Sequence, residues 1–497
     1  MYQIPKFILI VLVSTAFAIS APAQEIYRLD LETSILLARQ KSIRMQTLQQ
    51  SLKAASFNLK AAISSNRTHV DLNLTLPQYT ETVKQWEDST GISFYPVRQS
   101  QLASSLTIRH PLPTDGSLYI RAGGQSYTDY YANDRNTQLS SSIGLRQPIE
   151  AFFGINNNRM NYRQAKLNYE MTMKQLKREE LNLVYDISQD YFTLLQMQER
   201  MNIARLSLEK QKEACTIAQS KFAAGLIREV EALQMEVDLS ASENSFDMAK
   251  VDFLSQVGSF KQNLGLSLKD SIVVSSEFTI KPVAVNVEKA VDLALNNRPE
   301  IRENAIRIEM QEMNIKRQRA QGMPSGSILL DYNFIGVGKD PRTVTMGGTF
   351  DQTWQNLTSR PGSFGVGLTA SIPIVDWGEN KARVQSAIAS LKQDQLQMED
   401  NKMTIERDIR TQVDRLQSSL RRLQLLEKSL VVAEKSFDIS RQRYANGEID
   451  SQSMALERER LNGAYNTRLD AYISYKLLLS DLMRKTFYDF EKDKAVQ

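Results

Sequence analysis

The apolar positions of this chain follow two periods, and each period predicts one kind of element. Residues 363–374 alternate, with apolar side chains from Phe364 to Ile374 on one side and mostly glycine, threonine and serine on the other, which predicts a strand with one apolar face. Residues 158–222 and 380–444 instead follow a helical pattern with no internal proline, in which an apolar residue recurs at every seventh position from Ile187 to Phe222 and from Ile409 to Tyr444. A seven-residue repeat held this long predicts left-handed coiled-coil helices, each roughly 100 Å long at about 1.5 Å per residue.

Each long helix is predicted to end in a tight turn. Phe222 is followed by Gly225, and Tyr444 by Gly447, and glycine just past a helix end is the expected left-handed stop. A second run of apolar heptads then returns along the first. The sequence therefore predicts two helical hairpins, at about 158–264 with a tip at 222–231 and at about 380–484 with a tip at 444–453.

The two hairpins belong to a duplicated unit. Each heptad position of the second hairpin is its counterpart in the first plus 222. Upstream, an offset of 258 aligns Ile43 with Ile301 and Val70 with Ile328, and an offset of 225 aligns Pro148 with Pro373. Because internal repeats define architecture, the chain is predicted to be mainly α with a small antiparallel β portion. It would consist of two tandem repeats, 24–280 and 281–497, each with a helix, strands and a long hairpin.

The drop in offset from 258 to 225 leaves 33 extra residues among the strands of the first repeat. Strands are predicted within about 68–149 in the first repeat, and at about 327–337 and 363–374 in the second. The extra residues hold a possible inserted hairpin near 102–127 with a Pro-Thr-Asp-Gly turn. The protomer thus has four or six strands. The aromatic residues flanking the insertion are either membrane-interface residues or plain loop residues (Tyr79, Trp86, Phe94, Tyr95, Tyr130, Tyr131).

Residues 1–23 predict a secretory signal peptide, because a single lysine precedes an apolar run and a small-x-small cleavage site. No later stretch approaches the 18 apolar residues of a spanning helix. The formal net charge of +4 is spread over both signs, which argues against nucleic acid as a partner. The single cysteine, Cys215, excludes an internal disulfide and lies on the heptad seam, where we expect burial. No phosphate loop, nucleophile elbow or metal-ligand spacing is present, so we expect no enzyme, no cofactor and no bound metal.

Four or six strands cannot close a barrel alone, and unpaired strand edges cannot face lipid. Strands from other copies must therefore complete the sheet, and a trimer would supply 12 or 18. A tube of this kind is a passive conduit. The competing hypothesis is a secreted coiled-coil stalk or adhesin, anchored in the outer membrane by shared strands.

The doubled unit, the strand ending Ile372-Pro373-Ile374-Val375-Asp376-Trp377-Gly378 and the two aromatic-x-x-Gly tips resemble the TolC-type outer-membrane efflux family over residues 24–485. The resemblance implies a homotrimeric channel-tunnel in the outer membrane of a Gram-negative bacterium. A shared transmembrane β-barrel in outer-membrane lipid would continue into a long periplasmic α-barrel. The tips would bind a periplasmic adaptor (membrane fusion) protein, which connects to an inner-membrane pump in a tripartite efflux or secretion system.

The resemblance also implies a gate at the tips. The family's acidic residue of the first tip falls on Glu231, and its tyrosine and glycine of the second tip fall on Tyr444 and Gly447. The chain departs from the family pattern after Gly447, where it has Ile449, Ser453 and Leu456 in place of charged residues. Other gate candidates are the aromatic residue and glycine of the first turn and the remaining charged residues of both turns (Phe222, Gly225, Arg228, Glu229, Glu448, Asp450). The alternative is that these charges are solvated tip residues with little individual effect.

Overall fold

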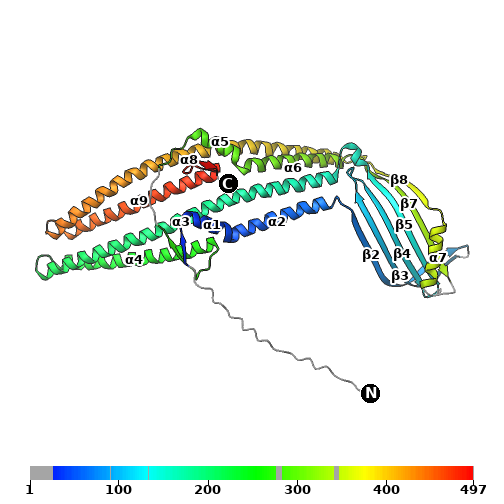
Figure 1. Cartoon of the computed structure of the whole chain (residues 1–497), viewed down its shortest axis with the longest axis horizontal. Coiled ribbons are helices and arrows are strands. Elements are labelled where there is room, and N and C mark those ends of the chain that lie inside the picture. The colour runs from blue at the N-terminus through cyan, green and yellow to red at the C-terminus, as the bar shows by residue number, and fades with distance from the viewer. Residues whose placement is uncertain (1–25, 90, 132–133, 276–281, 341–345, 496–497) are drawn as a thin grey trace, which may run out of the picture.

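The computed structural model describes residues 26–89, 91–131, 134–275, 282–340 and 346–495. The predicted signal peptide, residues 1–23, lies outside these. An antiparallel sheet stands at one end of the molecule, two long helical hairpins form the other, and shorter helices lie between them (Figure 1). The prediction of a mainly helical protein with an antiparallel sheet is confirmed. The helices are α1 (Leu31–Lys41), α2 (Ile43–Ser64), α3 (Asn157–Ala223), α4 (Glu229–Leu264), α5 (Val287–Asn297), α6 (Pro299–Gln321), α7 (Met346–Ser359), α8 (Glu379–Ala445) and α9 (Ser451–Thr486).

Six antiparallel strands form the main sheet in the order β2-β3-β4-β5-β7-β8. Their bounds are β2 (His69–Asp88), β3 (Gly91–Pro111), β4 (Ser117–Asp129), β5 (Asp134–Pro148), β7 (Ser325–Asp340) and β8 (Ser363–Ser371). The six-strand alternative is therefore the observed one. Small two-stranded pairings lie elsewhere, between β1 (Ile26–Leu29) and β6 (Ser271–Val274) and between β9 (Tyr488–Asp489) and β10 (Lys494–Ala495).

The two faces of the main sheet differ in polarity. One row of paired residues crosses all six strands with only apolar side chains (Val70, Ile108, Ile120, Ile143, Tyr332, Phe364). The adjacent row, one residue along each strand, points to the opposite face and is polar (Asp71, Thr107, Arg121, Ser142, Asn333, Ser363). Side chains alternate between the faces of a strand, so the pattern sorts apolar residues onto one face and polar residues onto the other.

Two strand predictions need correction, and one helix was not predicted. β8 ends at Ser371 rather than at residue 374, because the chain reaches Pro373, which has no N–H to donate to a ladder. β3 begins at Gly91 rather than near residue 102, since its first half pairs with an equally long β2 beyond a bulge between Thr75 and Gln78. Helix α7, between β7 and β8, was not predicted.

The long helices lie where the heptads predict them, with α3 and α8 each one residue longer at both ends. The opening helix of each repeat, however, is divided in two. In the second repeat Pro299 begins a new helix after Arg298, because a proline lacks the N–H that a continuous helix requires. In the first repeat Ser42 caps the new helix, its side chain accepting a hydrogen bond from the N–H of Met45 (3.2 Å).

Neighbouring helices form a wall. Toward the tips, α3 packs on α4 and α9, and α9 packs on α8, so that α4 and α8 are the outer helices of the wall. Toward the sheet, α3 packs on α2 and α6, and α6 on α8. A buried cluster at mid-length joins these helices around fully buried side chains such as Phe260 and Tyr475, and a second cluster near the tips contains Cys215, which is 3% exposed, as expected. Among the described residues, no helix is both long and apolar enough to cross a membrane.

Candidate functional site

The two helical tips have the same turn geometry. Gly225 and Gly447 adopt positive φ angles of 66° and 81°. In the first tip the N–H of Gly225 donates to the carbonyl of Phe222, and the N–H of Leu226 to that of Lys221. The second tip repeats both bonds 222 residues later, from Gly447 to Tyr444 and from Glu448 to Arg443. This pair of bonds is the glycine-dependent helix stop that the sequence predicts.

The aromatic residues of the two tips nevertheless have different environments. Tyr444 is buried, with 6% of its surface exposed, in the cluster that joins both hairpins. Phe222, its counterpart in the first tip, is 43% exposed. Within the protomer, only the second tip therefore buries its aromatic side chain.

Lys221 of the first hairpin contacts Tyr444 of the second. Its Nζ lies 4.7 Å from the centre of the Tyr444 ring and donates a 2.7 Å hydrogen bond to the Tyr444 carbonyl oxygen. An ammonium group over an aromatic face is attracted to the ring electrons, and the carbonyl gives it a second partner. One lysine thus connects the last turn of α3 to the last turn of α8.

Lys210 makes a similar contact farther from the tip. Its Nζ lies 4.5 Å from the ring centre of Phe437, which precedes Tyr444 by one heptad. Sequence reasoning missed both lysines, because each sits in a helix rich in charges, where a lysine is usually a solvated residue. Only the aromatic heptad on α8 was visible in the sequence.

A hollow of about 690 Å³ at the tips gathers part of the predicted site. Its lining includes Lys221 and, among the candidates, Glu231, Tyr444, Gly447, Glu448 and Asp450. Burial raises the pKa of the Tyr444 hydroxyl, and the nearby Glu231 carboxylate adds to this rise. The hydroxyl therefore stays protonated and can donate a hydrogen bond.

The charged candidates of the tips are engaged mostly within their own turns. Arg228 donates to Glu231 (3.1 Å), and Arg443 contacts Glu448 (3.2 Å). Asp450 caps α9, and its bonds from the hydroxyl and N–H of Ser453 lower its pKa. The other candidates, Phe222, Gly225, Arg228 and Glu229, do not line the hollow, and Glu229 is exposed in the first turn of α4.

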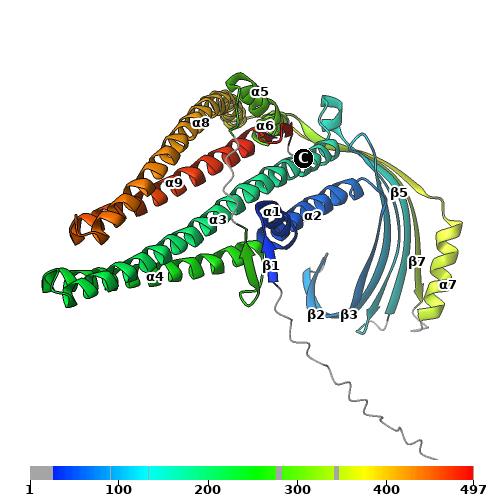
Figure 2. The same ribbon diagram turned by 60° about the vertical axis from the view of Figure 1, so that its left-hand side comes forward.

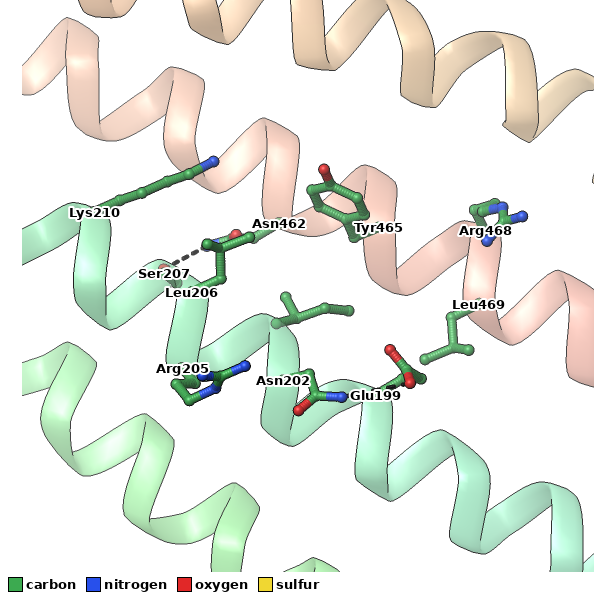
Figure 3. A pocket seen from close by; sticks show the side chains of 11 residues that line it. Glu199, Asn202, Arg205, Leu206, Ser207, Lys210, Asn462, Tyr465, Arg468 and Leu469 are labelled. Atoms are coloured by element: carbon green, nitrogen blue, oxygen red, sulfur yellow. Dashed lines mark hydrogen bonds between the residues drawn. The ribbon is translucent and has the colours of Figure 1, made fainter. Parts of the chain in front are cut away.

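A second hollow, of about 410 Å³, lies between α3 and α9 (Figure 3). Polar side chains line most of it, and the amide of Asn462 donates to the hydroxyl of Ser207 across it (3.0 Å). Burial raises the pKa of Glu199 at one end. Burial and the 2.6 Å bond to Glu434 raise the pKa of Tyr465 to about 12. The bond from Asn462 to Ser207 joins the second hairpin to the first, whereas the bond from Tyr465 to Glu434 joins α9 to α8 within the second hairpin.

The geometry is that of a wall and not of a reaction centre. Within the described part of the chain, no three His, Cys, Asp or Glu side chains gather as a metal site. A sheet with one apolar face, continued by paired long helices, is the arrangement expected of a channel-type outer-membrane protein.

Comparison with known proteins identifies the family within this class. The model of the outer membrane efflux protein family matches residues 115–265 and 290–476, which is more than half of the chain. The chain belongs to this family, whose members are efflux channels of the Gram-negative outer membrane.

Similar structures extend over nearly the whole chain. The CmeC outer membrane channel of Campylobacter jejuni is 16% identical with a TM-score of 0.68, over 94% of this chain and 86% of that one. The outer membrane protein VceC of Vibrio cholerae is 14% identical with a TM-score of 0.66, over 94% and 97%. Nodulation protein T of Rhizobium leguminosarum bv. trifolii is 22% identical over 271 residues, which span 54% of this chain and 55% of that relative.

Proposed function

We propose that this chain is the outer-membrane channel-tunnel of a tripartite efflux or secretion system, acting as a homotrimer. Solutes would pass through it from a periplasmic adaptor and an inner-membrane pump to the outside. The observation that carries the proposal is that each lateral edge of the chain has a strand paired on one side only and an outer helix with exposed apolar residues. The alternative, a stalk or adhesin, requires no such closure into a tube.

The sheet edges supply the first part of this observation. Within the described residues, β2 and β8 each pair on one side only. The six strands alternate in direction, so β8 of one copy and β2 of the next would meet antiparallel. Three copies would give 18 strands, and barrels of roughly 16–18 strands enclose an aqueous channel. The apolar face would then contact lipid and the polar face would line the channel.

The outer helices supply the second part. On α8 an apolar stripe at heptad spacing is exposed: Leu425 (67%), Val432 (68%) and Ile439 (50%). On α4, at the other edge, Leu233, Val237 and Val251 are exposed by 51–65%. Exposed heptad stripes are unsatisfied coiled-coil seams. We infer that α8 of one copy packs on α4 of the next.

The duplication gives this contact a template. The first and last residues of α9 are those of α4 shifted by 222 positions, and the first and last residues of α8 are those of α3 shifted by 222. The contact of α3 with α9 inside the chain therefore has an equivalent in the contact of α8 with α4 of the next copy. Ile203 and Ile217, which correspond to Leu425 and Ile439 on α8, are partly buried inside the chain, Ile203 at the hollow between α3 and α9 and Ile217 against the cluster near the tips.

The same equivalence extends to the tips and to the proposed gate. Lys221 lies over Tyr444 inside the chain, and the corresponding residues are Arg443 and Phe222. We therefore propose that Arg443 of one copy lies over Phe222 of the next, which accounts for the exposure of Phe222. The entrance would be surrounded by alternating contacts within and between copies, with Glu231, Glu448 and Asp450 beside them. The adaptor would bind at the outer surface of these tips.

Charge placed on the α8 stripe tests the proposal. Val432→Asp should prevent trimer formation, whereas Val431→Asp should not, because the neighbouring valine is equally exposed (64%) but lies off the stripe. Light scattering of detergent-purified protein measures the mass, and planar bilayers measure conductance. A monomeric but conducting wild type, or equal behaviour of both variants, would contradict the proposed closure. A trimer without conductance would favour the stalk.

A further inference from the structure

Helix α7 lies on the outer face of the sheet at the end remote from the long helices. It connects β7 to β8 and runs alongside β7 on the convex side of the curved sheet (Figure 2). β8 pairs with β7 only as far as Asn333, so the last part of β7 is covered by α7 instead.

A seam of small residues fixes α7 in this position. A Cβ atom on Gly336 would come within 2.2 Å of the Thr353 carbonyl oxygen, and one on Gly338 within 2.3 Å of the Thr349 carbonyl oxygen. Thr349 and Thr353 are fully buried, and the hydroxyls of Thr349 and Thr137 are 2.9 Å apart. Only glycine permits so close a helix, so the sequence of β7 is adapted to carry α7.

The remaining surface of α7 exposes large aromatic side chains. Phe350 and Trp354 are 47% and 54% exposed, one helical turn apart, and Asp351 is the only charged residue of the helix. The glycine seam faces the same side of the sheet as the apolar row that ends in Tyr332 and Phe364. That side is the face that the proposed barrel turns toward lipid. The aromatic pair of α7 therefore extends an apolar surface already present.

A second aromatic group lies at the opposite end of this surface. Trp377 is 97% exposed and Phe152 70%, both where the sheet passes into the long helices. β8 between the two groups has nine residues. At roughly 3.3 Å per residue and a tilt of about 40°, nine residues cover about 23 Å. Outer-membrane barrels carry an apolar band about 25 Å tall with an aromatic girdle at each boundary.

We propose that α7 is an anchor in the outer leaflet, with Phe350 and Trp354 inserted at the boundary between lipid headgroups and acyl chains. The inference rests on the proposed membrane barrel. It adds that α7 forms one boundary of the apolar band on the barrel's outer face. Aromatic side chains with an apolar body favour this boundary over either water or the hydrocarbon interior. The exposed surface of α7 is continuous with the apolar face of the sheet, which the proposed barrel turns toward lipid. We therefore infer that lipid, rather than a second copy of the chain, contacts α7.

The three tryptophans of the chain allow a direct test, because each occupies a different level. Trp354 marks α7, and Trp377 marks the opposite girdle. Trp86 marks the far part of β2, which extends beyond the end of β4. Its partner on β3 is Ser93, whereas the last residue of β4, Asp129, pairs with Gln99 of β3. Three variants, each keeping one tryptophan and replacing the other two by phenylalanine, are reconstituted into vesicles of phosphatidylcholines brominated at different depths.

We expect Trp354 and Trp377 emission to be quenched most by bromines near the headgroup, and Trp86 emission to be unaffected. Quenching of Trp377 without quenching of Trp354 would refute the α7 anchor but not the membrane barrel. Strongest quenching of Trp354 by deep bromines would likewise refute the placement of α7 at the headgroup boundary. If no tryptophan is quenched, the membrane barrel itself fails. Trp354 shielded from both bromines and aqueous acrylamide would show that another copy covers α7, which also overturns the anchor.

A variant that displaces α7 provides a second test, with quenching of Trp354 fluorescence as the measurement. Gly336→Val should detach α7, so that lipid quenching of Trp354 falls and acrylamide quenching rises. Gly367→Val on β8 is the matched control, because a Cβ there meets its nearest atom at 3.9 Å. Unchanged quenching of Trp354 in the Gly336→Val protein would refute the docked anchor.

Discussion

Replacing Lys221 by methionine should loosen the second tip from the first. Methionine keeps the length and apolar stem of lysine but removes the charge that lies over Tyr444 and the hydrogen bond to its carbonyl oxygen. A cation on a partly desolvated ring contributes about 1–2 kcal/mol, and a hydrogen bond from a charged donor a similar amount. Because one ammonium makes both contacts, we expect a loss of ~2 kcal/mol, or about a 30-fold larger opening constant.

Hydrogen exchange in purified protein measures this opening. Amides of the second tip, including the N–H of Gly447 bonded to the Tyr444 carbonyl, should exchange up to about 30-fold faster in the Lys221→Met protein. Lys221→Arg should preserve most of the protection, since a guanidinium also stacks on an aromatic face.

Lys212→Met is the matched control. Lys212 contacts Glu243 (3.7 Å) within the first hairpin and does not reach the second. The contact is half-exposed, and such pairs contribute little. If Lys221→Met and Lys212→Met change the exchange of the second tip equally, or if neither changes it by more than about twofold, the lysine does not hold the tips together.

Four further outcomes concern stability. Burial and Glu434 raise the pKa of Tyr465 to about 12, so above pH 10 this tyrosine deprotonates in the unfolded chain before it does in the folded one. Stability should therefore fall from pH 10 to about 12. Tyr465→Phe should reduce the steepness of this fall, while Tyr472, whose pKa is also raised to about 12, retains part of it. Gly447→Ala, at φ 81°, should cost about 1–2 kcal/mol in denaturant titration, whereas Gly463→Ala within α9 should stabilise by up to about 1 kcal/mol. Phe260→Ala, fully buried, should lose about 3–5 kcal/mol by the same measurement. Cys215 should react with Ellman's reagent only after unfolding, and reaction of the native protein would contradict its burial.

The parts of the fold that the sequence predicts are those with a strictly local cause. The heptads of residues 187–222 and 409–444 specify helices, because the spacing of seven places their apolar residues along one helical face. The N-caps Asp30 of α1 and Asn286 of α5 have a local cause of this kind, because each side chain accepts a hydrogen bond from the N–H of a residue three positions later. The glycine stops of the tips belong to the same kind of signal.

Elements that depend on distant partners were predicted poorly or not at all. Helix α7 has two glycines near its start and several threonines, a composition that disfavours helix in isolation. It forms against Gly336 and Gly338 of β7, whose side-chain-free surface admits it. The first half of β3 was missed for a similar reason, since the bulge after Thr75 shifts the alternation of its partner strand.

The tips show how two identical local signals acquire different roles. Phe222 and Tyr444 occupy the same heptad position, and their turns make the same hydrogen bonds. Tyr444 is buried because α3 of the same chain precedes α8 in the wall and brings Lys221 to its ring. Phe222 lies in the last turn of α3, which packs on the edge helix α4, and it is 43% exposed there, where the wall of a single chain ends. Its exposure therefore follows from its place in the wall rather than from its sequence, and Arg443 of an adjoining copy is the residue that the duplication assigns to cover it.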